Sequence, residues 1–301
     1  MYYNCSSKIW GINYLKMKTA ALIYGRNDGY KEDERLVVHI NSLIETFDEV
    51  LYLDWNSPEK KGSLLNSIHN KIDKTGKLKH FVIPESTVND FIGETPDVQP
   101  CLSVICHNIL LRRCTADWVV ATTNDIIAPK KEFLTKFLTQ KADPNTFYTL
   151  SRRDIEYSEV KKMGFDNWRE LREILDKTSE PRLLPAKITT NDVWSIINCC
   201  GDFQLAHRNL WHSIKGFEEG MIYACFSDTN VQKKAVLNGY NLEAIYDIPL
   251  YHMSHKGMGN DGSSPSKQHY NCAWDWVENF QESLNDDNWG WDGIDIEYEI
   301  I

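Results

Sequence analysis

The sequence predicts an α/β protein with a mostly parallel central sheet flanked by helices. Short apolar runs, which are typical of buried strands, alternate with segments whose apolar residues recur every three to four positions, as in amphipathic helices. Such alternation favours βαβ units, whose right-handed crossovers bring the loops after the strands to one edge of the sheet. The strands are expected at 20–24, 50–56 and 81–84, and the helices at 36–47 and 64–72.

A central strand is expected at 118–122, and it leads into Asn124 and Asp125. In open α/β sheets, ligands bind at this carboxyl edge. A carboxylate, a carboxamide and the hydroxyls of Thr122 and Thr123 suit a hard divalent cation, which prefers oxygen ligands. An Asn-Asp turn that caps the next helix would account for the same residues.

The remaining elements extend this core. We expect helices at 102–113 and 132–141, a strand at 147–150, a charged helical insertion without assignable chemistry at 152–182, two short strands separated by Gly201-Asp202, a helix that begins at Asp228, and a strand at 242–248. We expect three parts of the chain: an N-terminal extension at 1–18, a single domain at 19–256 and a C-terminal tail at 257–301.

Composition limits the functional classes. The 301 residues carry a net charge of −10, whereas nucleic-acid-binding surfaces are usually basic, so that role is not expected. The eight cysteines include no C-x-x-C pair, which argues against structural zinc and favours free thiols in a reducing compartment. No apolar run approaches the roughly 18 residues of a membrane span. We therefore expect a cytoplasmic protein, and the Lys-, Asn- and Ile-rich usage favours bacteria or virus-infected cells as its source.

Several charged groups are candidates for binding an anion and a metal. Arg112 and Arg113 end a helix at the rim from which the 118–122 strand begins, and arginine pairs bidentately with phosphate, although the helix dipole also favours cations there. His252 and His255 follow the last predicted strand in a Tyr-His-x-x-His cluster. Imidazole joins carboxylates in manganese-type sites, so these histidines and Asp125 predict a metal site. A structural role is the alternative for either histidine.

The motifs, in their order along 19–256, resemble the glycosyltransferases of the GT-A fold, close to the family 2 type. The order and spacing of the motifs make the set specific, whereas each one alone is weak. The resemblance is carried by Gly25-Arg26-Asn27-Asp28, Asp54-Trp55-Asn56-Ser57-Pro58, Asn108-x-x-x-Arg112, Asp117-Trp118-Val119-Val120-x-x-x-Asn124-Asp125, Gly201-Asp202-Phe203-Gln204-Leu205, Trp211 with Gly216-Phe217-x-Glu219, Asp228, and Pro249-x-Tyr251-His252-x-x-His255.

The resemblance implies a nucleotide-sugar-binding half at 19–130 and an acceptor-side half at 131–256. It implies that Asp28 and Asp54 contact the base and ribose, and that Arg112 approaches the diphosphate. The whole nucleotide-sugar site is expected to comprise Tyr24, Gly25, Arg26, Asn27, Asp28, Asp54, Arg112 and Asn124.

The resemblance also implies a metal and catalytic groups. Asp125 stands where the last aspartate of the family's Asp-x-Asp signature binds Mn²⁺ or Mg²⁺, and Thr123 replaces the first aspartate. His255, or else His252, matches the late histidine that completes the metal site. The acceptor side is expected to comprise Asp202, Trp211 and Phe217, with Asp228 or Glu219 as the catalytic base. Core packing is the alternative for the two aromatic residues, and a helix start is the alternative for Asp228.

The implied function is a hexosyltransferase-type reaction. A sugar would move from a nucleotide diphosphate, expected to be UDP, to a hydroxyl of a glycan or glycoprotein acceptor. The metal would stabilise the departing diphosphate, and a carboxylate base would accept the acceptor's proton, which favours inversion.

Two other functions stay open. A sugar-phosphate nucleotidyltransferase would carry a glycine-rich loop with Arg and Lys after the first strand, and Gly25-Arg26-Asn27-Asp28-Gly29 matches it poorly. A non-catalytic nucleotide- or glycan-binding module would explain the missing first aspartate of the metal signature.

Overall fold

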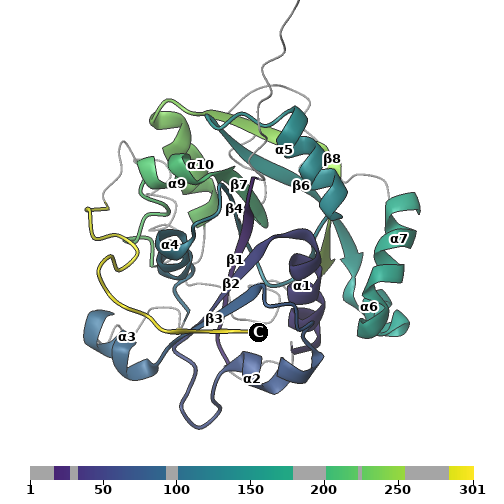
Figure 1. Cartoon of the computed structure of the whole chain (residues 1–301), viewed down its shortest axis with the longest axis horizontal. Helices are drawn as coiled ribbons and strands as arrows, with labels where there is room; N and C mark the ends of the chain where they lie inside the picture. Colours follow the sequence, from purple (N-terminus) through teal and green to yellow (C-terminus); the bar gives the residue numbers. More distant parts are fainter. Residues whose placement is uncertain (1–16, 28–32, 93–100, 179–200, 223–225, 255–284) are drawn as a thin grey trace, which may run out of the picture.

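The computed structural model describes residues 17–27, 33–92, 101–178, 201–222, 226–254 and 285–301 of the chain (Figure 1). Within these ranges, nine strands form a single sheet in the order β5-β8-β6-β7-β4-β1-β2-β3-β9. The strands are β1 (Thr19–Gly25), β2 (Glu49–Trp55), β3 (Leu78–Ile83), β4 (Trp118–Thr122), β5 (Ile126–Ile127), β6 (Thr146–Glu156), β7 (Phe203–His207), β8 (Asn241–Ser254) and β9 (Tyr298–Ile300).

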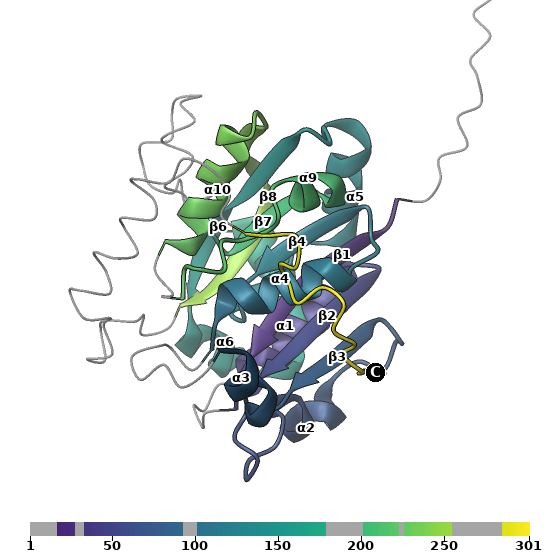
Figure 2. The ribbon, with the colours of Figure 1, turned by 90° about the vertical axis from the view of Figure 1, so that its left-hand side faces the viewer.

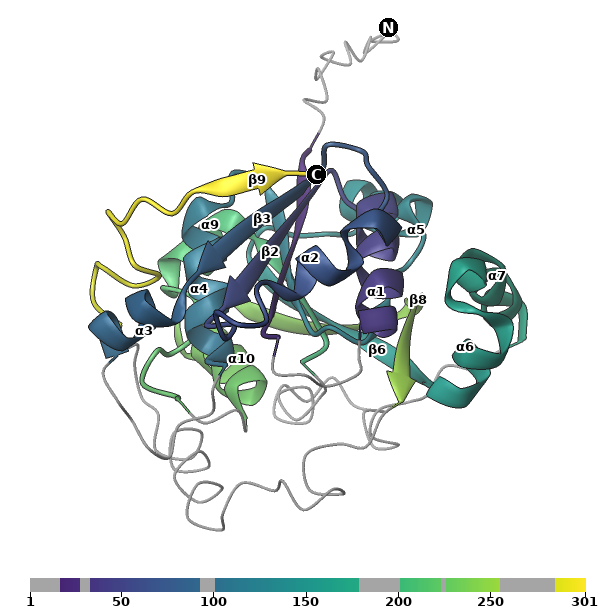
Figure 3. The ribbon, with the colours of Figure 1, turned by 90° about the horizontal axis from the view of Figure 1, so that it is seen from below.

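Helices cover both faces of this sheet (Figures 1 and 3). Their bounds are α1 (Asp33–Thr46), α2 (Leu64–Ile68), α3 (Glu85–Ile92), α4 (Ser103–Arg113), α5 (Lys131–Gln140), α6 (Tyr157–Met163), α7 (Trp168–Thr178), α9 (Arg208–Ser213) and α10 (Ser227–Leu237). Side chains of α4, α9 and α10 form a core with one face, and those of α1, α2 and α5 form a second core with the other. A smaller cluster joins α6 and α7 to β6 and β8.

The strand directions confirm the predicted fold class. β1, β2, β3 and β4 are parallel neighbours, and β6 and β8 are parallel to each other. β7 lies antiparallel between β4 and β6, so β6 and β8 point in the same direction as β4. Ala20–Ile23 of β1 are fully buried. Helices on both faces explain why this strand reads as a continuous apolar run, with no alternation.

Two strands extend further than the sequence predicts. β6 continues to Glu156, and β8 continues past Pro249 to Ser254. The two strands pair across a register shift between Leu150 and Arg152, and Pro249 lies in the irregular stretch of β8, where its missing N–H is tolerated. The prediction of a helical insertion at 152–182 is therefore wrong for 152–156, which belong to β6, and it is confirmed for α6 and α7. The sequence pattern also does not predict α3, β5 or β9.

The C-terminal segment, defined here as residues 285–301, packs against the rest of the sheet and helices (Figures 2 and 3). β9 pairs antiparallel with β3 and so covers that edge of the sheet. Trp289 is buried, and the Arg112 guanidinium of α4 lies 4.6 Å from the centre of its ring. This segment is thus an integral part of the fold, although the sequence pattern suggested only an appended tail.

Arginines at the end of α4 anchor this segment through its backbone. Arg112 Nε donates to the Trp289 carbonyl at 3.0 Å, and Arg113 NH1 donates to the Gly290 carbonyl at 3.0 Å. Arg113 NH2 also reaches the carbonyls of Trp291 and Ile294, at 3.2 and 2.5 Å. Charge-assisted bonds of this kind are stronger than neutral ones, so the segment is held along its length.

Two expectations from composition can be compared with the described residues. None of their helices is long and apolar enough to cross a membrane. Their cysteines, Cys101, Cys106 and Cys114, are free thiols, as expected. A cytoplasmic location stays a prediction.

A buried histidine of α4, His107, lies against the carboxyl end of β4. Nε2 of His107 lies 3.3 Å from the carbonyl oxygen of Thr122, and its ring stacks on Phe217 and meets Tyr24 edge to face. Burial lowers the pKa of His107 from 6.5 to about 4, so the ring is neutral in the folded protein at neutral pH.

Replacing Trp289 by Ala should lower the free energy of unfolding by about 3–5 kcal/mol, the usual loss for a large buried aromatic side chain. Trp289 is 3% exposed, whereas Ile300 in the same segment is 60% exposed. Ile300→Ala is therefore the matched control, and it should change stability by less than about 0.5 kcal/mol. Urea unfolding measures both values. Small losses for both variants would mean that the segment adds little to stability.

The free energy of unfolding should decrease as the pH falls from 6.5 to about 4, because the unfolded chain takes up the His107 proton before the folded protein does. His107→Gln keeps an N–H donor but cannot titrate, so its stability should depend less on pH in this window. His69 is exposed, so His69→Gln is the matched control for the loss of a histidine. Urea unfolding at several pH values provides the test, and a wild-type slope in His107→Gln would contradict the prediction.

Candidate functional site

The loops after β1 and β2 lie together at the carboxyl edge of the sheet. Arg26 Nε donates to the Asn56 carbonyl at 2.8 Å, and the Asn27 backbone N–H donates to Ser57 Oγ at 2.8 Å. Asn27 Nδ2 also donates to the Gly62 carbonyl at 3.1 Å. Arg26 and Asn27 therefore hold the loop after β2 in place. Their predicted neighbour in the site, Asp28, lies outside the described residues.

The end of β1 is closely packed against its neighbours. A Cβ atom on Gly25 would lie 2.5 Å from Tyr52 Oη, so a larger residue would have to displace that phenol. The Tyr24 carbonyl accepts a hydrogen bond from Asn124 Nδ2 at 2.5 Å, which ties β1 to the loop after β4. Burial raises the pKa of the Tyr24 phenol, which therefore stays neutral.

Three buried side-chain oxygens at this edge have no donor among the described residues, namely Oδ1 of Asp54, Asn56 and Asn124. The other carboxylate oxygen of Asp54 accepts from Ser63 Oγ at 2.7 Å and from the Leu64 N–H at 2.9 Å, which anchors the start of α2. A buried acceptor without a donor costs about 1–3 kcal/mol. These oxygens therefore fit the N–H and O–H groups of a bound ligand.

Strand pairing brings Asp125 against His252. Ile126 of β5 pairs with His252 of β8, and the Met253 N–H donates to the Asp125 carbonyl at 2.7 Å. His252 Nε2 lies 3.4 Å from Asp125 Oδ2. Thr123 Oγ1 donates to Asp125 Oδ1 at 2.7 Å, so the residue in place of the first signature aspartate orients the second.

Two residues of β6 continue this cluster, and sequence reasoning missed both. His252 Nδ1 lies 2.9 Å from Asp154 Oδ1. Arg152 forms ion pairs with Asp154, at 3.1 Å from Nε, and with Asp202 through NH1. The available signal was the spacing of two between Arg152 and Asp154, which places them on one face of a strand. It was hidden because the charged residues that follow are helical.

Asp228 lies in the first turn of α10 and against Gly201. A Cβ atom on Gly201 would lie 2.2 Å from Asp228 Cβ, so glycine permits this approach. Burial raises the pKa of Asp228, and the charge of Asp202 raises it further, while backbone N–H donors such as that of Thr229 act against the shift. A partly buried carboxyl with a raised pKa, close to another carboxylate, is a candidate general base.

The other predicted base, Glu219, contacts the C-terminal segment. Its Oε1 accepts from Asn108 Nδ2 at 3.0 Å and from the Gly290 N–H at 2.7 Å. Burial raises the pKa of Glu219 as well, although the two donors oppose the shift. These contacts give Glu219 a structural role in joining α4 to the C-terminal segment.

The structure contradicts the expected diphosphate contact of Arg112. α4 leads back to the amino end of β4, so Arg112 lies at the opposite edge of the sheet from Asp125. Its guanidinium is bound by carbonyls of the C-terminal segment and by Asp292, at 2.8 Å. The sequence could not show this because the partners are distant in the chain.

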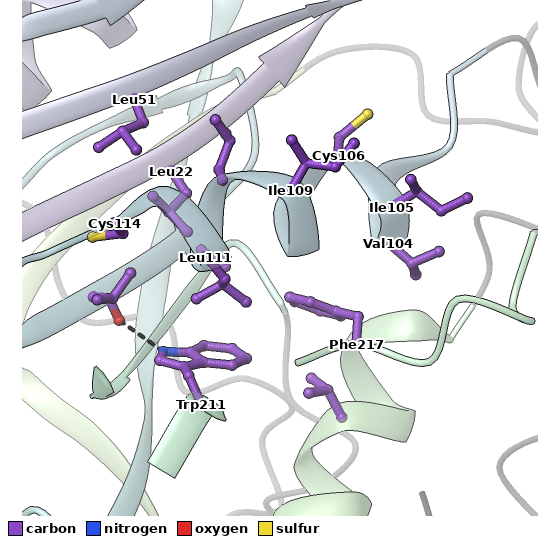
Figure 4. Packing of buried hydrophobic residues seen from close by; sticks show 14 of the residues in the cluster. Leu22, Leu51, Val104, Ile105, Cys106, Ile109, Leu111, Cys114, Trp211 and Phe217 are labelled. Atoms are coloured by element: carbon purple, nitrogen blue, oxygen red, sulfur yellow. Dashed lines mark hydrogen bonds between the residues drawn. The ribbon is translucent and has the colours of Figure 1, made fainter. Parts of the chain in front are cut away.

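The structure also contradicts the expected acceptor wall of Trp211 and Phe217. Both are buried in the core, where their rings stack at 5.5 Å (Figure 4). Trp211 Nε1 donates to the Val119 carbonyl at 3.1 Å, drawn as the dashed line in Figure 4. Of the three predicted acceptor residues, Asp202 alone lies in the cluster with Arg152.

His252 Nε2 and Asp125 Oδ2, 3.4 Å apart, are a nitrogen and an oxygen of the kinds that bind a divalent cation. A neutral imidazole carries one N–H, so it can donate to Asp154 or to Asp125 but not to both. The ring nitrogen without a proton then faces a carboxylate oxygen, and both atoms are acceptors. A divalent cation or a second ring proton between them would satisfy both. Among the described residues, no three His, Cys, Asp or Glu side chains converge as a ligand set. The other predicted ligand, His255, lies outside them.

Comparisons with known proteins bear on the fold. No protein-family model matches the sequence, and no curated protein is similar to it in sequence. The mannosyltransferase PcManGT from Pyrobaculum calidifontis, in complex with GDP-Man and Mn²⁺, matches with a TM-score of 0.50 and 15% identity, over 81% of this chain and 59% of that chain. S. aureus TarS 1-349 in complex with UDP matches with a TM-score of 0.51 and 14% identity, over 89% of this chain and 67% of that chain.

A third similar structure is GalNAc-T7 with UDP, GalNAc and Mn²⁺. It matches with a TM-score of 0.53 and 12% identity, over 87% of this chain and 48% of that chain. This chain thus spans about half of GalNAc-T7 and three fifths of PcManGT. At such identities the likeness concerns the arrangement of the sheet and helices. The chain has the GT-A fold found in glycosyltransferases.

Proposed function

We propose that the protein is a glycosyltransferase of the hexosyltransferase type, which moves a sugar from a UDP-linked donor to a hydroxyl of a glycan or glycoprotein. The observation that carries this proposal is the cluster at the carboxyl edge of a GT-A sheet, where Asp125 faces His252 and the partly buried Asp228 lies near Asp202. The first pair offers ligands for a cation on the diphosphate, and Asp228 offers a base.

The donor would bind to residues from the 19–130 half. The unpaired oxygens of Asp54, Asn56 and Asn124 would accept hydrogen bonds from the base and the ribose. UDP is preferred because TarS and GalNAc-T7, two of the three similar structures, were solved with it. Arg26 and Asn27 would act by holding the loop that carries Asn56.

Asp125 and His252 would hold Mn²⁺ or Mg²⁺ together with the diphosphate. The ion would supply Lewis-acid stabilisation of the departing diphosphate. Three carboxylates, those of Asp125, Asp154 and Asp202, surround Arg152 and His252. A diphosphate would be repelled by this excess of negative charge unless a cation came with it.

The acceptor would bind beside the 131–256 half, and Asp228 would remove the proton of its hydroxyl as the sugar carbon is attacked. A carboxylate that acts as a base needs no covalent sugar intermediate, so the proposed transfer inverts the anomeric centre. Burial keeps the Asp228 carboxylate more basic than an exposed aspartate, which favours this proton transfer.

A panel of UDP- and GDP-sugars tests the reaction class. With Mn²⁺, slow nucleotide release is expected from one donor, and EDTA or Asp125→Ala should reduce it by about 100-fold or more because the diphosphate loses its cation. Asp247→Ala, which removes an exposed carboxylate that pairs with Lys141, is the matched control and should have no effect. Absence of release from every donor, without metal-dependent binding of UDP or GDP in calorimetry, would leave a binding module.

The pH dependence of kcat/KM tests the base. The rate should fall on the acid side at a pH above the ordinary aspartate pKa of about 4, since burial raises the pKa of Asp228 and only the carboxylate accepts a proton. Asp228→Asn should reduce kcat by about 100- to 10,000-fold and remove this acid limb. Glu219→Gln should keep the limb. A limb that persists in Asp228→Asn would assign the base to another residue.

A further inference from the structure

We propose that Arg152 and Asp154 of β6 are positioning residues, through which the His252 imidazole is held toward Asp125 and the Asp202 carboxylate is fixed in place. This assignment rests on the proposed function, because it gives His252 the task of binding the metal. Neither residue touches the reacting atoms in this scheme. Each acts through a neighbour.

Strand pairing determines which groups meet around the imidazole. Asp154 is the partner of His252 in the parallel pair of β6 and β8, and Ile126, the residue after Asp125, is its partner in the pair of β5 and β8. The ring therefore lies between two carboxylates. Nδ1 is 2.9 Å from Asp154, and Nε2 is 3.4 Å from Asp125.

For a neutral ring, the two distances favour one tautomer. A distance of 2.9 Å is that of an N–H···O hydrogen bond, whereas 3.4 Å is long for one. The ring proton therefore belongs on Nδ1, where Asp154 accepts it, and the Nε2 lone pair points to Asp125. A carboxylate behind a histidine fixes the tautomer and ring orientation in this way in many metal sites, and it makes the ligand more basic.

Arg152 holds Asp154 in this role. Its Nε lies 3.1 Å from Asp154 Oδ1, which is an ion pair without hydrogen-bond geometry, and its NH1 donates to Asp202 Oδ2. The side chains of Arg152, Asp154 and Asp202 are only 23%, 19% and 12% exposed, so water screens their charges incompletely. Without the guanidinium, the two carboxylates would repel each other, and Asp154 would be drawn from the imidazole. A lysine ammonium lacks the planar fork that serves both carboxylates.

The first experiment records the ring nitrogens of His252 by ¹⁵N NMR of the histidine-labelled full chain at mildly alkaline pH, without metal. His252→Gln assigns its signals. The Nδ1–H form should dominate in the wild type, and Asp154→Asn and Arg152→Gln should shift the population toward the Nε2–H form. Arg153→Gln is the matched control, since Arg153 pairs with the Tyr251 hydroxyl at 3.3 Å. Its spectrum should match that of the wild type.

The second experiment titrates Mn²⁺ alone into the same proteins by calorimetry. Asp154→Asn and Arg152→Gln should weaken binding by about 10- to 100-fold, the usual effect of removing such a supporting group. Arg152→Lys should recover part of the loss because it restores the charge without the fork. Circular dichroism verifies that each variant is folded. If Asp154→Asn does not fold, the two Arg152 variants carry the test.

The outcomes separate this proposal from the proposed function. Unchanged His252 nitrogen signals in Arg152→Gln would overturn the positioning role, even in an active enzyme. A shifted tautomer in a protein that turns over no donor would support the positioning role and leave the glycosyltransferase proposal refuted. Wild-type Mn²⁺ affinity in Arg152→Gln would equally overturn the positioning role.

Discussion

The site depends on the position of β4, which is paired on both sides. β1 lies parallel on one side and β7 antiparallel on the other, and Thr122 at the end of β4 pairs with Phe203. Asp202 precedes Phe203 and Asp125 follows Thr122 by three positions, so one pair of strands sets both carboxylates at the same edge. The Thr122 hydroxyl donates to the Asp202 carbonyl at 2.5 Å, which reinforces the alignment.

The edge gathers more negative than positive charge, and its carboxylates share their partners. Arg152 serves Asp154 and Asp202, while the His252 ring faces Asp125 and Asp154. Burying unpaired carboxylates is unfavourable, so such an arrangement persists where each one keeps a partner.

A second set of contacts holds the loop before α10. Asn108 of α4 donates to the Phe217 carbonyl and accepts from the Phe217 N–H, both at 2.8 Å. Gly216 next to it has a φ of +59°, and a Cβ atom there would lie 2.1 Å from Asn108 Oδ1. Lys234 of α10 is fully buried and donates to the Gly216 carbonyl at 2.9 Å. The loop, α4 and α10 are therefore fixed together, and Asp228 lies at the start of a well-anchored helix.

Local sequence patterns determined the sheet and part of the site. Apolar runs such as Ala20–Ile23 can form only buried strands in this context, and the alternation with helices fixed their parallel direction. Asp125 and His252 were predicted as site residues because each follows a predicted strand at the edge of the sheet where ligands of open α/β proteins bind. A single sequence could not show whether Trp211 and Phe217 line a surface or a core, since aromatic side chains are suited to both.

What the tertiary structure alone decided is which distant side chains meet. Asp154 faces His252 because β6 and β8 pair beyond an irregular stretch, and Arg112 is covered because residues 285–301 fold back onto α4. Periodicity states which face of its own strand or helix a residue occupies. The register between strands that are far apart in the chain depends on the packing of the whole sheet. A local sequence pattern therefore does not predict it.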